Sequence, residues 1–463
     1  MRLPVVFALV VALGTPAVAL ADPLAGPQTV VEQAGANAGA ACRRDTPAAD
    51  EQCAAVPLTP AVNERAVDAY EQSDVHRALG LQFALGNDLP FARASWLGTH
   101  NSFNTTTRTP TLSGLDSNQQ LSMTDQLRLD VRSLELDAHW FPSARAGGAY
   151  APVLCHARGA NEKHAGCSTE PLLSEGLAEI AAWLRANPRQ VLLLYVEDHL
   201  ETPAGHAQGA AALRAAFGDD EDGLLYAPAG TSRAGCIELP LNLTRNDVLA
   251  DGKQVVVISG CAAGAGWNST VFSGEDRATH ETGPAGYGED GTCAANREPA
   301  ELDSHLLRVF EDATALSATT TMSRNPITPG KADALQRCAV DITGFDQLLP
   351  QDGRLAASVW SWAPGEPAAT GDCAVQGPDG WQARECGERH AFACRSADGT
   401  WSVDGTVTPY AAAGGRCKGS SVATPRYGYE GVQLERAMAA AGASTVWLAY
   451  SRTGSTWTPT DTR

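Results

Sequence analysis

The stretch TEPLLSEGLAEIAAWLRANPRQVLLLYVEDH, residues 169–199, decides the fold class of this chain. Its first part carries apolar residues at helical spacing from Leu173 to Leu184 and ends at Pro188, which predicts an amphipathic helix. An unbroken apolar run, residues 191–196, follows at once and is typical of a strand covered on both faces, as in a parallel sheet. The stretch therefore predicts one helix–strand unit of an α/β protein.

Apolar strands and amphipathic helices alternate on both sides of this unit. We predict strands at residues 94–100 (ASWLGTH), 131–140 (VRSLELDAHW), 151–157 (APVLCHA), 190–199, 253–260 (KQVVVISG), 269–272 (STVF, weak), 341–345 (DITGF) and 356–362 (AASVWSW). We predict further helices at residues 121–130, 305–316 and 329–340. Eight strands suffice for an irregular TIM-type (β/α)8 barrel, and a doubly wound sheet is the alternative. No G-x-G-x-x-G follows a strand, which counts against a dinucleotide-binding sheet.

The amino-terminal segment and the charge point to export. Residues 1–21 carry Arg2, an apolar run and a small-x-small end, which predicts a signal peptide. The chain has 463 residues and a net charge of −19, and cleavage after Ala21 would leave 33 − 53 = −20. This charge excludes a general attraction to nucleic acid or anionic membranes. No later apolar run approaches the ~18 residues that cross a bilayer, so we expect a secreted, soluble monomer, extracellular or periplasmic.

The composition divides the rest of the chain into four parts. We expect an N-terminal extension at residues 22–90, the barrel at 91–365, a disulfide-rich insertion at 366–425 and a closing helix and strand at 426–463. We expect the closing segment to complete the outer layer of the barrel.

The 12 cysteines include no C-x-x-C pair, so up to six disulfides are the better interpretation in an exported chain. Proximity in sequence suggests Cys42 with Cys53, Cys155 with Cys167, Cys236 with Cys261, and Cys293 with Cys338.

Residues that bind metals or move protons end four successive predicted strands. They are His100 and Asn101, Glu135 and Asp137 with His139 on the same strand face, His156, and Glu197 and Asp198. A single such residue is more often a cap than a catalyst, but four strand ends in succession favour a functional site. If the strands are parallel, their carboxyl ends meet at one face.

The residue types at these ends indicate a hard cation beside an acid/base pair. Two neighbouring carboxylates repel each other unless a cation or a shared proton lies between them. Oxygen ligands without Cys favour Ca²⁺, with Mg²⁺ as the alternative, over zinc. Two histidines beside such a cation could act as acid and base around a phosphate.

Four motifs in this order and spacing carry a family resemblance. WLGTHNSF, RSLELDAHW, PVLCHARG and VLLLYVEDH, within residues 94–200, resemble the X-type catalytic region of phosphatidylinositol-specific phospholipases C. That family of phosphodiesterases is a TIM-type barrel with His-Asn, Glu-x-Asp, His and Glu-Asn-His at these strand ends. Here the last motif is Glu197, Asp198, His199.

The resemblance implies a role for each matching position. It implies the calcium ligands Asn101, Glu135, Asp137 and Glu197, and the catalytic histidines His100 and His156. In the family mechanism a neighbouring hydroxyl attacks the phosphodiester and gives a cyclic phosphate, which water then opens. By analogy His100 would polarise the phosphoryl group or help to activate the hydroxyl, His156 would protonate the departing alcohol, and Glu135 could double as general base.

The chain departs from the family in two respects. The lysines that grip inositol phosphates on the next strand are replaced by Ile258, Ser259 and Gly260, which argues against polyphosphorylated inositol. No inositol-stacking residue can be matched. Trp360 and Trp362 could stack on a ring, and core packing is an equally good interpretation. Asp198 and His139 are further candidates for substrate contact.

Residues 360–394 resemble the second half of a C-type lectin-like domain. The matching features include Asp372, Trp381 and three cysteines, and the family pairing implies Cys373 with Cys386, leaving Cys394 for a partner such as Cys417. Gln382 and Ala383 stand where sugar-binding lectins carry Ca²⁺ ligands, so that site is lost and we predict a disulfide-stiffened flap.

The leading hypothesis is a secreted metal-dependent phosphoric diester hydrolase that acts on a phospholipid or a soluble phosphodiester, with transient membrane contact and no nucleic acid. A glycerophosphodiester phosphodiesterase or a sphingomyelinase D-like enzyme is the near alternative, and the His100–Asn101 pair argues against it. A non-catalytic glycan-binding barrel is the alternative from another class.

Overall fold

The computed structural model describes residues 60–105, 107, 117–156, 167–229, 235–262, 266–274, 279–293, 302–314 and 326–461. The predicted signal peptide and the predicted Cys42–Cys53 bridge lie outside these residues. The described α-helices are α3 (Pro60–Glu71), α4 (Asp74–Leu85), α5 (Met123–Arg128), α6 (Leu173–Ala186), α7 (Pro203–Phe217), α8 (Arg245–Ala250), α10 (Pro329–Arg337), α11 (Gly353–Ala357) and α12 (Gly428–Ala441).

The larger sheet is a curled parallel sheet. Its strands are β1 (Trp96–Thr99), β2 (Ser133–Pro142), β3 (Tyr150–Leu154), β4 (Leu192–His199), β5 (Val255–Ser259), β6 (Phe272–Ser273), β7 (Thr279–Thr282), β8 (Leu306–Phe310) and β9 (Ile342–Phe345). Along the path β6-β5-β4-β2-β1-β9-β8-β7 every neighbouring pair is parallel. Within the described residues the two end strands do not pair, so the sheet is an open, irregular TIM-like barrel. The predicted fold class is confirmed.

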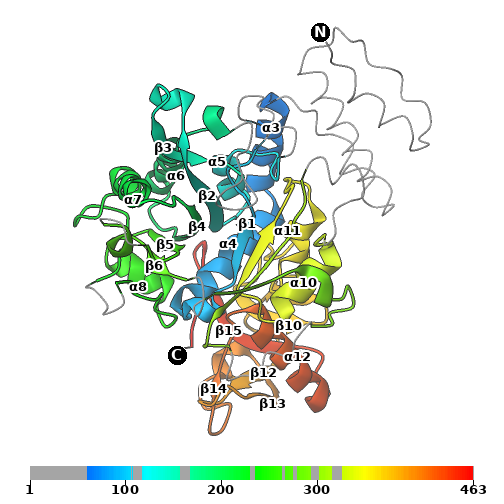
Figure 1. Cartoon of the computed structure of the whole chain (residues 1–463). Helices are drawn as coiled ribbons and strands as arrows, with labels where there is room; N and C mark the ends of the chain where they lie inside the picture. Colours follow the sequence, from blue (N-terminus) through cyan, green and yellow to red (C-terminus); the bar gives the residue numbers. More distant parts are fainter. Residues whose placement is uncertain are drawn as a thin grey trace, which may run out of the picture.

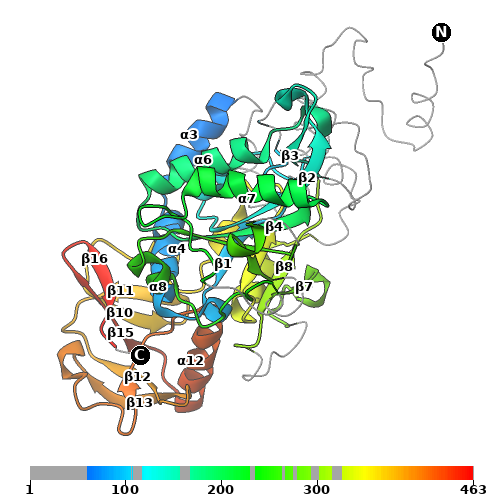
Figure 2. The ribbon, with the colours of Figure 1, turned by 60° about the vertical axis from the view of Figure 1, so that its left-hand side comes forward.

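The apolar run of β4 packs on both of its faces, as its sequence predicts. Leu192 and Leu194 belong to the core between the sheet and helices α6 and α7, and Leu193 belongs to the core inside the curled sheet. Figure 2 shows α6 and α7 lying across the outside of the sheet. Because side chains alternate along a strand, Glu197 lies on the inner side with Leu193. The helical layer thus fixes which charged residues face the barrel interior.

Three predicted elements of the barrel are wrong. Residues 151–157 form a strand, but β3 runs antiparallel to β2 in a hairpin. Residues 305–316, predicted as a helix, contain strand β8, because an apolar run buried on both faces has no periodicity that separates strand from helix. Residues 356–362, predicted as a strand, begin at the end of α11 and form no strand, apart from an isolated bridge between Trp362 and Trp381. Strand β7 was not predicted.

The C-terminal residues form a second sheet, below the first in Figure 1. Its strands are β10 (Cys373–Gly377), β11 (Gly380–Arg384), β12 (His390–Arg395), β13 (Trp401–Thr408), β14 (Ser421–Val422), β15 (Val446–Thr453) and β16 (Thr456–Pro459). Strand β15 lies between β10 and β12. The closing strand therefore belongs to this sheet and not to the barrel, and residues 366–425 are not a flap but part of the same sheet. The closing helix α12 does lie against the barrel helix α10, where Arg337 pairs with Glu435 at 2.6 Å.

Five disulfides join described cysteines, in the pairings expected from proximity and from the lectin-like resemblance. They are Cys155–Cys167, Cys236–Cys261, Cys293–Cys338, Cys373–Cys386 and Cys394–Cys417. Among the described helices, none combines the length and the apolar character needed to cross a bilayer.

Candidate active site

Strands β2 and β4 bring three carboxylates together on the inner side of the barrel. In the parallel register Asp137 lies beside Glu197, and Glu135 is two residues before Asp137 on the same strand face. Carboxylate oxygens of Glu135, Asp137 and Glu197 lie within 4.8 Å of one another. Glu135 and Asp137 are buried, whereas the side chain of Glu197 is 47% exposed. The cluster therefore opens to solvent on the side of Glu197.

Asn101 adds a fourth oxygen to this cluster. Its backbone is in the left-handed region, with φ of 46°, which Asn tolerates better than most residues. This conformation directs its backbone N–H to Oε2 of Glu135 at 3.0 Å. Its side-chain oxygen faces both carboxylate oxygens of Asp137, at 2.8 and 3.0 Å. Two facing acceptors repel, and either an amide rotated by 180° or a cation between them relieves the contact.

The electrostatics of the cluster favour a cation. Burial, and then the charges of Glu135 and Glu197, raise the pKa of Asp137 well above its usual range. A bound divalent cation would offset this mutual repulsion. The three carboxylates of Glu135, Asp137 and Glu197 are the oxygen ligands that Ca²⁺ and Mg²⁺ prefer, so they fit such an ion. Asn101 would join them with its amide oxygen turned toward the ion.

Arg308, which sequence analysis missed, lies inside the site. It projects from β8, and its guanidinium donates to Glu135 Oε1 at 2.6 Å and to Glu281 Oε1 at 2.7 Å. The side chain is only 4% exposed and lies over the rings of Tyr195 and Phe310. Burial by itself would raise the pKa of Glu135, but Arg308 and then His100 outweigh it and lower that pKa. Arg308 therefore keeps the carboxylate of Glu135 ionised.

His100 is held by a second residue that sequence analysis missed. Its Nδ1 lies 3.2 and 3.1 Å from the two carboxylate oxygens of Asp346, which follows β9. Its Nε2 lies 3.7 Å from Glu135 Oε2. Burial alone would lower the pKa of His100, but Asp346 and Glu135 raise it to about 10. The sequence did contain a signal, because Asp346 stands at a strand end as His100 does.

Asp346 is itself fixed by hydrogen bonds. The backbone N–H of Ala313 donates to its Oδ2 at 2.7 Å, and Gln119 donates to its Oδ1 at 3.2 Å. Burial raises its pKa. A carboxylate fixed in this way orients the imidazole that it contacts. It accepts a hydrogen bond from Nδ1–H, so that Nε2 faces the carboxylate cluster.

His156 reaches the same part of the sheet by an unexpected route. The carboxyl end of β3 returns along β2, and the backbone N–H of Cys155 donates to the carbonyl of Asp137 at 3.3 Å. His156 is the next residue and is half-buried. The hairpin, anchored by the Cys155–Cys167 disulfide, thus brings His156 to the level of Asp137.

The other strand-end residues lie in different surroundings. His139 and His199 stack with ring centroids 4.4 Å apart, and Nε2 of His199 is 3.1 Å from Glu197 Oε1, so this pair borders the carboxylate cluster. Asp198 contacts His206 of α7 at 2.7 Å and accepts the backbone N–H of Leu200. The structure therefore gives Asp198 a structural contact away from the cluster.

Trp360 and Trp362 do not reach the strand-end site. Trp362 is 3% exposed and packs against Trp381 and Trp457 in the core of the C-terminal sheet. Trp360 lines a cavity at the opposite end of β1. The structure supports the core-packing interpretation for both, since their segment is not a strand of the barrel.

Comparison with known proteins agrees with the sequence motifs. A family model described as the Rv2075c PI-PLC-like domain matches residues 55–352. The uncharacterized protein Rv2075c of Mycobacterium tuberculosis is 39% identical over 443 residues, which cover 93% of this chain and 90% of that protein. A PI-PLC X domain-containing protein of Arabidopsis thaliana is 26% identical over 229 residues, covering 48% of this chain and 49% of that protein.

Solved structures with a similar fold include bacterial enzymes. Phosphatidylinositol-specific phospholipase C from Listeria monocytogenes has 13% identity and a TM-score of 0.40, covering 59% of this chain and 95% of its own. A calcium-dependent phosphoinositol-specific phospholipase C from Pseudomonas sp. has 15% identity and a TM-score of 0.33, covering 60% and 95%.

Proposed function

This chain belongs to the family of the Rv2075c PI-PLC-like domain, and on that premise we propose that it is a secreted, metal-dependent phosphoric diester hydrolase. The observation that carries the proposal is the convergence of His100, its partner Asp346 and the three-carboxylate cluster at one end of the parallel sheet. Such a constellation combines an oriented proton carrier with a site for a hard cation. The leader segment and the disulfides support export.

The reaction that we propose is attack of a substrate hydroxyl on the neighbouring phosphodiester, followed by opening of the cyclic phosphate by water. His100, oriented by Asp346, contacts the attacking hydroxyl or the phosphoryl oxygen. His156, at the level of Asp137, protonates the departing alcohol. Arg308 places fixed positive charge beside the site, which favours an anionic phosphoryl group.

In this proposal Glu135 contributes its negative charge to the site and does not remove the proton of the attacking hydroxyl. Both of its oxygens already accept hydrogen bonds, from Arg308 and from the backbone of Asn101, and its pKa is lowered. A carboxylate so occupied is a weak base. Without a cation, Asp346 and Glu135 raise the pKa of His100 to about 10, so the imidazole keeps its proton. With a cation bound beside Glu135 this pKa would fall, and His100 would then be the better candidate for general base.

Asn101, Asp137 and Glu197, with Glu135, would hold the cation. A divalent cation bound there would stabilise the negative charge that develops on the phosphoryl oxygens. Ca²⁺ is the first candidate because the ligands are oxygens and Glu197 is open to solvent.

The β2–β3 hairpin is a candidate for membrane contact. It extends from the site, and the rings of Trp140 and Tyr150 lie 5.8 Å apart on it. Tyr150 is 56% exposed, and among the described residues only Val407 is also an exposed large hydrophobic residue. Aromatic side chains with polar tips are suited to the lipid interface. We therefore favour a phospholipid, with phosphatidylinositol as the first substrate to assay.

A substrate panel tests the proposal. Phosphatidylinositol, phosphatidylcholine, sphingomyelin and glycerophosphodiesters would be incubated with the protein in Ca²⁺ or in chelator. We expect diacylglycerol and cyclic inositol phosphate from phosphatidylinositol in Ca²⁺ alone. Equal turnover in chelator would contradict the cation site, and turnover of glycerophosphodiesters alone would favour that alternative activity. No turnover of any diester would contradict the proposed function.

A further inference from the structure

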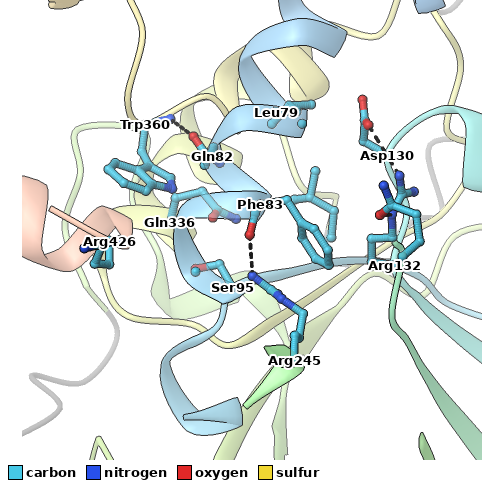
Figure 3. A pocket seen from close by; sticks show the side chains of 14 residues that line it. Leu79, Gln82, Phe83, Ser95, Asp130, Arg132, Arg245, Gln336, Trp360 and Arg426 are labelled. Atoms are coloured by element: carbon cyan, nitrogen blue, oxygen red, sulfur yellow. Dashed lines mark hydrogen bonds and ion pairs between the residues drawn. The ribbon is translucent and has the colours of Figure 1, made fainter. Parts of the chain in front are cut away.

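A small cavity lies at the amino ends of the strands, opposite the candidate active site. Its volume is about 40 Å³, and it is lined by residues at the start of β1, residues that precede β2 and β4, and helix α4. Figure 3 shows three arginines approaching it from different sides: Arg132, Arg245 and Arg426. All three are buried.

The charge of the cavity lining is positive although the protein is acidic. Three guanidinium groups line it, and Asp130 is the carboxylate among the lining residues, so the lining charge is 3 − 1 = +2 against −19 for the chain. Asp130 is already engaged, since the hydroxyl of Tyr70 donates to it at 2.8 Å and Nδ1 of His76 lies 2.9 Å away. Arg132 lies 3.8 Å from Asp130, and outside the lining Asp461 pairs with Arg426 at 2.9 Å. The positive charge that remains without an ion-pair partner among the described residues is therefore that of Arg245.

Arg245 carries most of this imbalance. Its side chain packs on the Phe83 ring at 3.6 Å, and Nε and Nη2 donate to Asn87 Oδ1 and to the carbonyl of Phe83. Its Nη1 is buried and has no hydrogen-bond partner among the described residues, none of which forms an ion pair with Arg245. Burial and the nearby Arg132 lower its pKa to about 9. A buried charge without a counter-charge is costly.

Other donors around the cavity also lack partners. Nε of Arg426 and Nε1 of Trp360 are buried without a hydrogen-bond partner in the described part of the chain. The side-chain oxygen of Gln336 is also buried without a hydrogen-bond partner in the described part of the chain. Rotation of that amide by 180° would place its NH₂ group, another donor, at the same position. Several N–H donors therefore point into the cavity without a hydrogen-bond acceptor in its lining.

We propose that this cavity binds a small inorganic anion, chloride or an oxyanion no larger than phosphate. This volume exceeds the ~10–15 Å³ that a cavity needs to hold one water, so the space suits one small anion or a few waters. Waters would satisfy the N–H groups of Arg245 but would leave its charge uncompensated. An anion does both, and it joins α4, the start of α8 and the loop of Arg426 at one point.

The test compares anions at constant ionic strength. The melting temperature of the whole protein is measured in sodium gluconate, whose anion is too large for the cavity, and then with increasing chloride or phosphate. We expect chloride or phosphate to raise the melting temperature by roughly 3 °C at saturation. Arg245→Met should remove this response. Arg93→Met is the matched control, because Arg93 pairs with Asp303 outside the cavity, and it should keep the response.

A crystal grown in bromide gives a readout that does not depend on any variant folding. We expect an anomalous peak within hydrogen-bond distance of Arg245 Nη1. Only water at this position, together with equal melting temperatures in gluconate, chloride and phosphate, would overturn the proposal. An anion response that persists in Arg245→Met would also overturn it.

Discussion

The two ends of the parallel sheet bury charge of opposite sign. At the carboxyl ends, the three buried carboxylates Glu135, Asp137 and Asp346 outnumber the two cations, Arg308 and the protonated His100. At the amino ends, Arg132 lies beside Asp130 and Arg426 pairs with Asp461, while the buried Arg245 has no ion-pair partner among the described residues. An excess of buried charge of one sign indicates that a ligand of the opposite sign binds there. The carboxyl ends would then bind a cation together with an anionic phosphodiester, and the amino ends a small anion.

The largest expected effect concerns the proton carrier at the carboxyl end. His100→Ala should reduce phosphodiester cleavage by ~10²–10⁴-fold, because an acid/base group of this kind typically contributes that much. The measurement is kcat/KM on the substrate found in the panel. The matched control is His305→Ala, which changes a histidine just before β8. A full rate in His100→Ala would show that the strand-end site is not the catalytic centre.

The next effect concerns the protein cation at the same end. Arg308→Met should lower the free energy of unfolding by ~3–5 kcal/mol, because Glu135 then remains buried without its partner. Urea denaturation measures the change. The double variant Arg308→Met/Glu135→Gln should recover part of it, since the only carboxylate left without its partner is then Glu281, which is 36% exposed. An Arg308→Met protein as stable as the wild type would contradict the ion pair.

Cation binding at the carboxyl end should be visible without any substrate. Saturating Ca²⁺ should raise the melting temperature of the wild-type protein by roughly 3 °C. Asp137→Asn should abolish the rise, because this buried carboxylate lies at the centre of the cluster. If Asp137→Asn responds to Ca²⁺ as the wild type does, the ion binds elsewhere.

A smaller effect concerns the lipid interface. Tyr150→Ser should weaken binding to phosphatidylinositol vesicles by about 5-fold, since one exposed aromatic ring is removed from the hairpin beside the site. Vesicle sedimentation measures the binding. Val407→Ser is the matched control, because Val407 is similarly exposed but lies on β13 of the C-terminal sheet. Equal losses in the two variants would argue against a specific role of the hairpin.

The smallest effect belongs to the amino ends. The contact with Asp130 raises the pKa of His76 above its usual value. Its contribution to stability is therefore fully present below the unfolded-state pKa of ~6.5 and is lost as pH rises through the folded-state value. His76→Asn should flatten the dependence of the melting temperature on pH above ~6.5. An unchanged pH dependence would exclude this linkage.

The sequence allowed the carboxyl end of the sheet to be predicted better than the amino end. His100, Glu135, Asp137 and Glu197 directly follow or end apolar runs, and such a run identifies both the strand and the face that its last residues share. The structure brings these residues together. The amino-end arginines come from loops and from the start of α8, where no periodicity links them.

The residues that were missed show why local patterns are insufficient. Arg308 lies in LLRVF, which was predicted as a helix, and only tertiary packing on both faces makes this run a strand with Arg308 pointing to Glu135. His156 lies near the carboxyl ends of the strands, as predicted, but the predicted reason is wrong. It follows the antiparallel strand of a hairpin and not a parallel strand. Strand direction depends on long-range pairing, which no single segment encodes.

The most direct test of the central claim is a ³¹P NMR time course of phosphatidylinositol vesicles with the wild-type protein and with His100→Ala. The wild type should convert the diester first to a five-membered cyclic phosphate and only later to a monoester, and His100→Ala should leave the diester intact over the same period. A monoester formed without the cyclic species, or the same cyclic product at the same rate from His100→Ala, would contradict it.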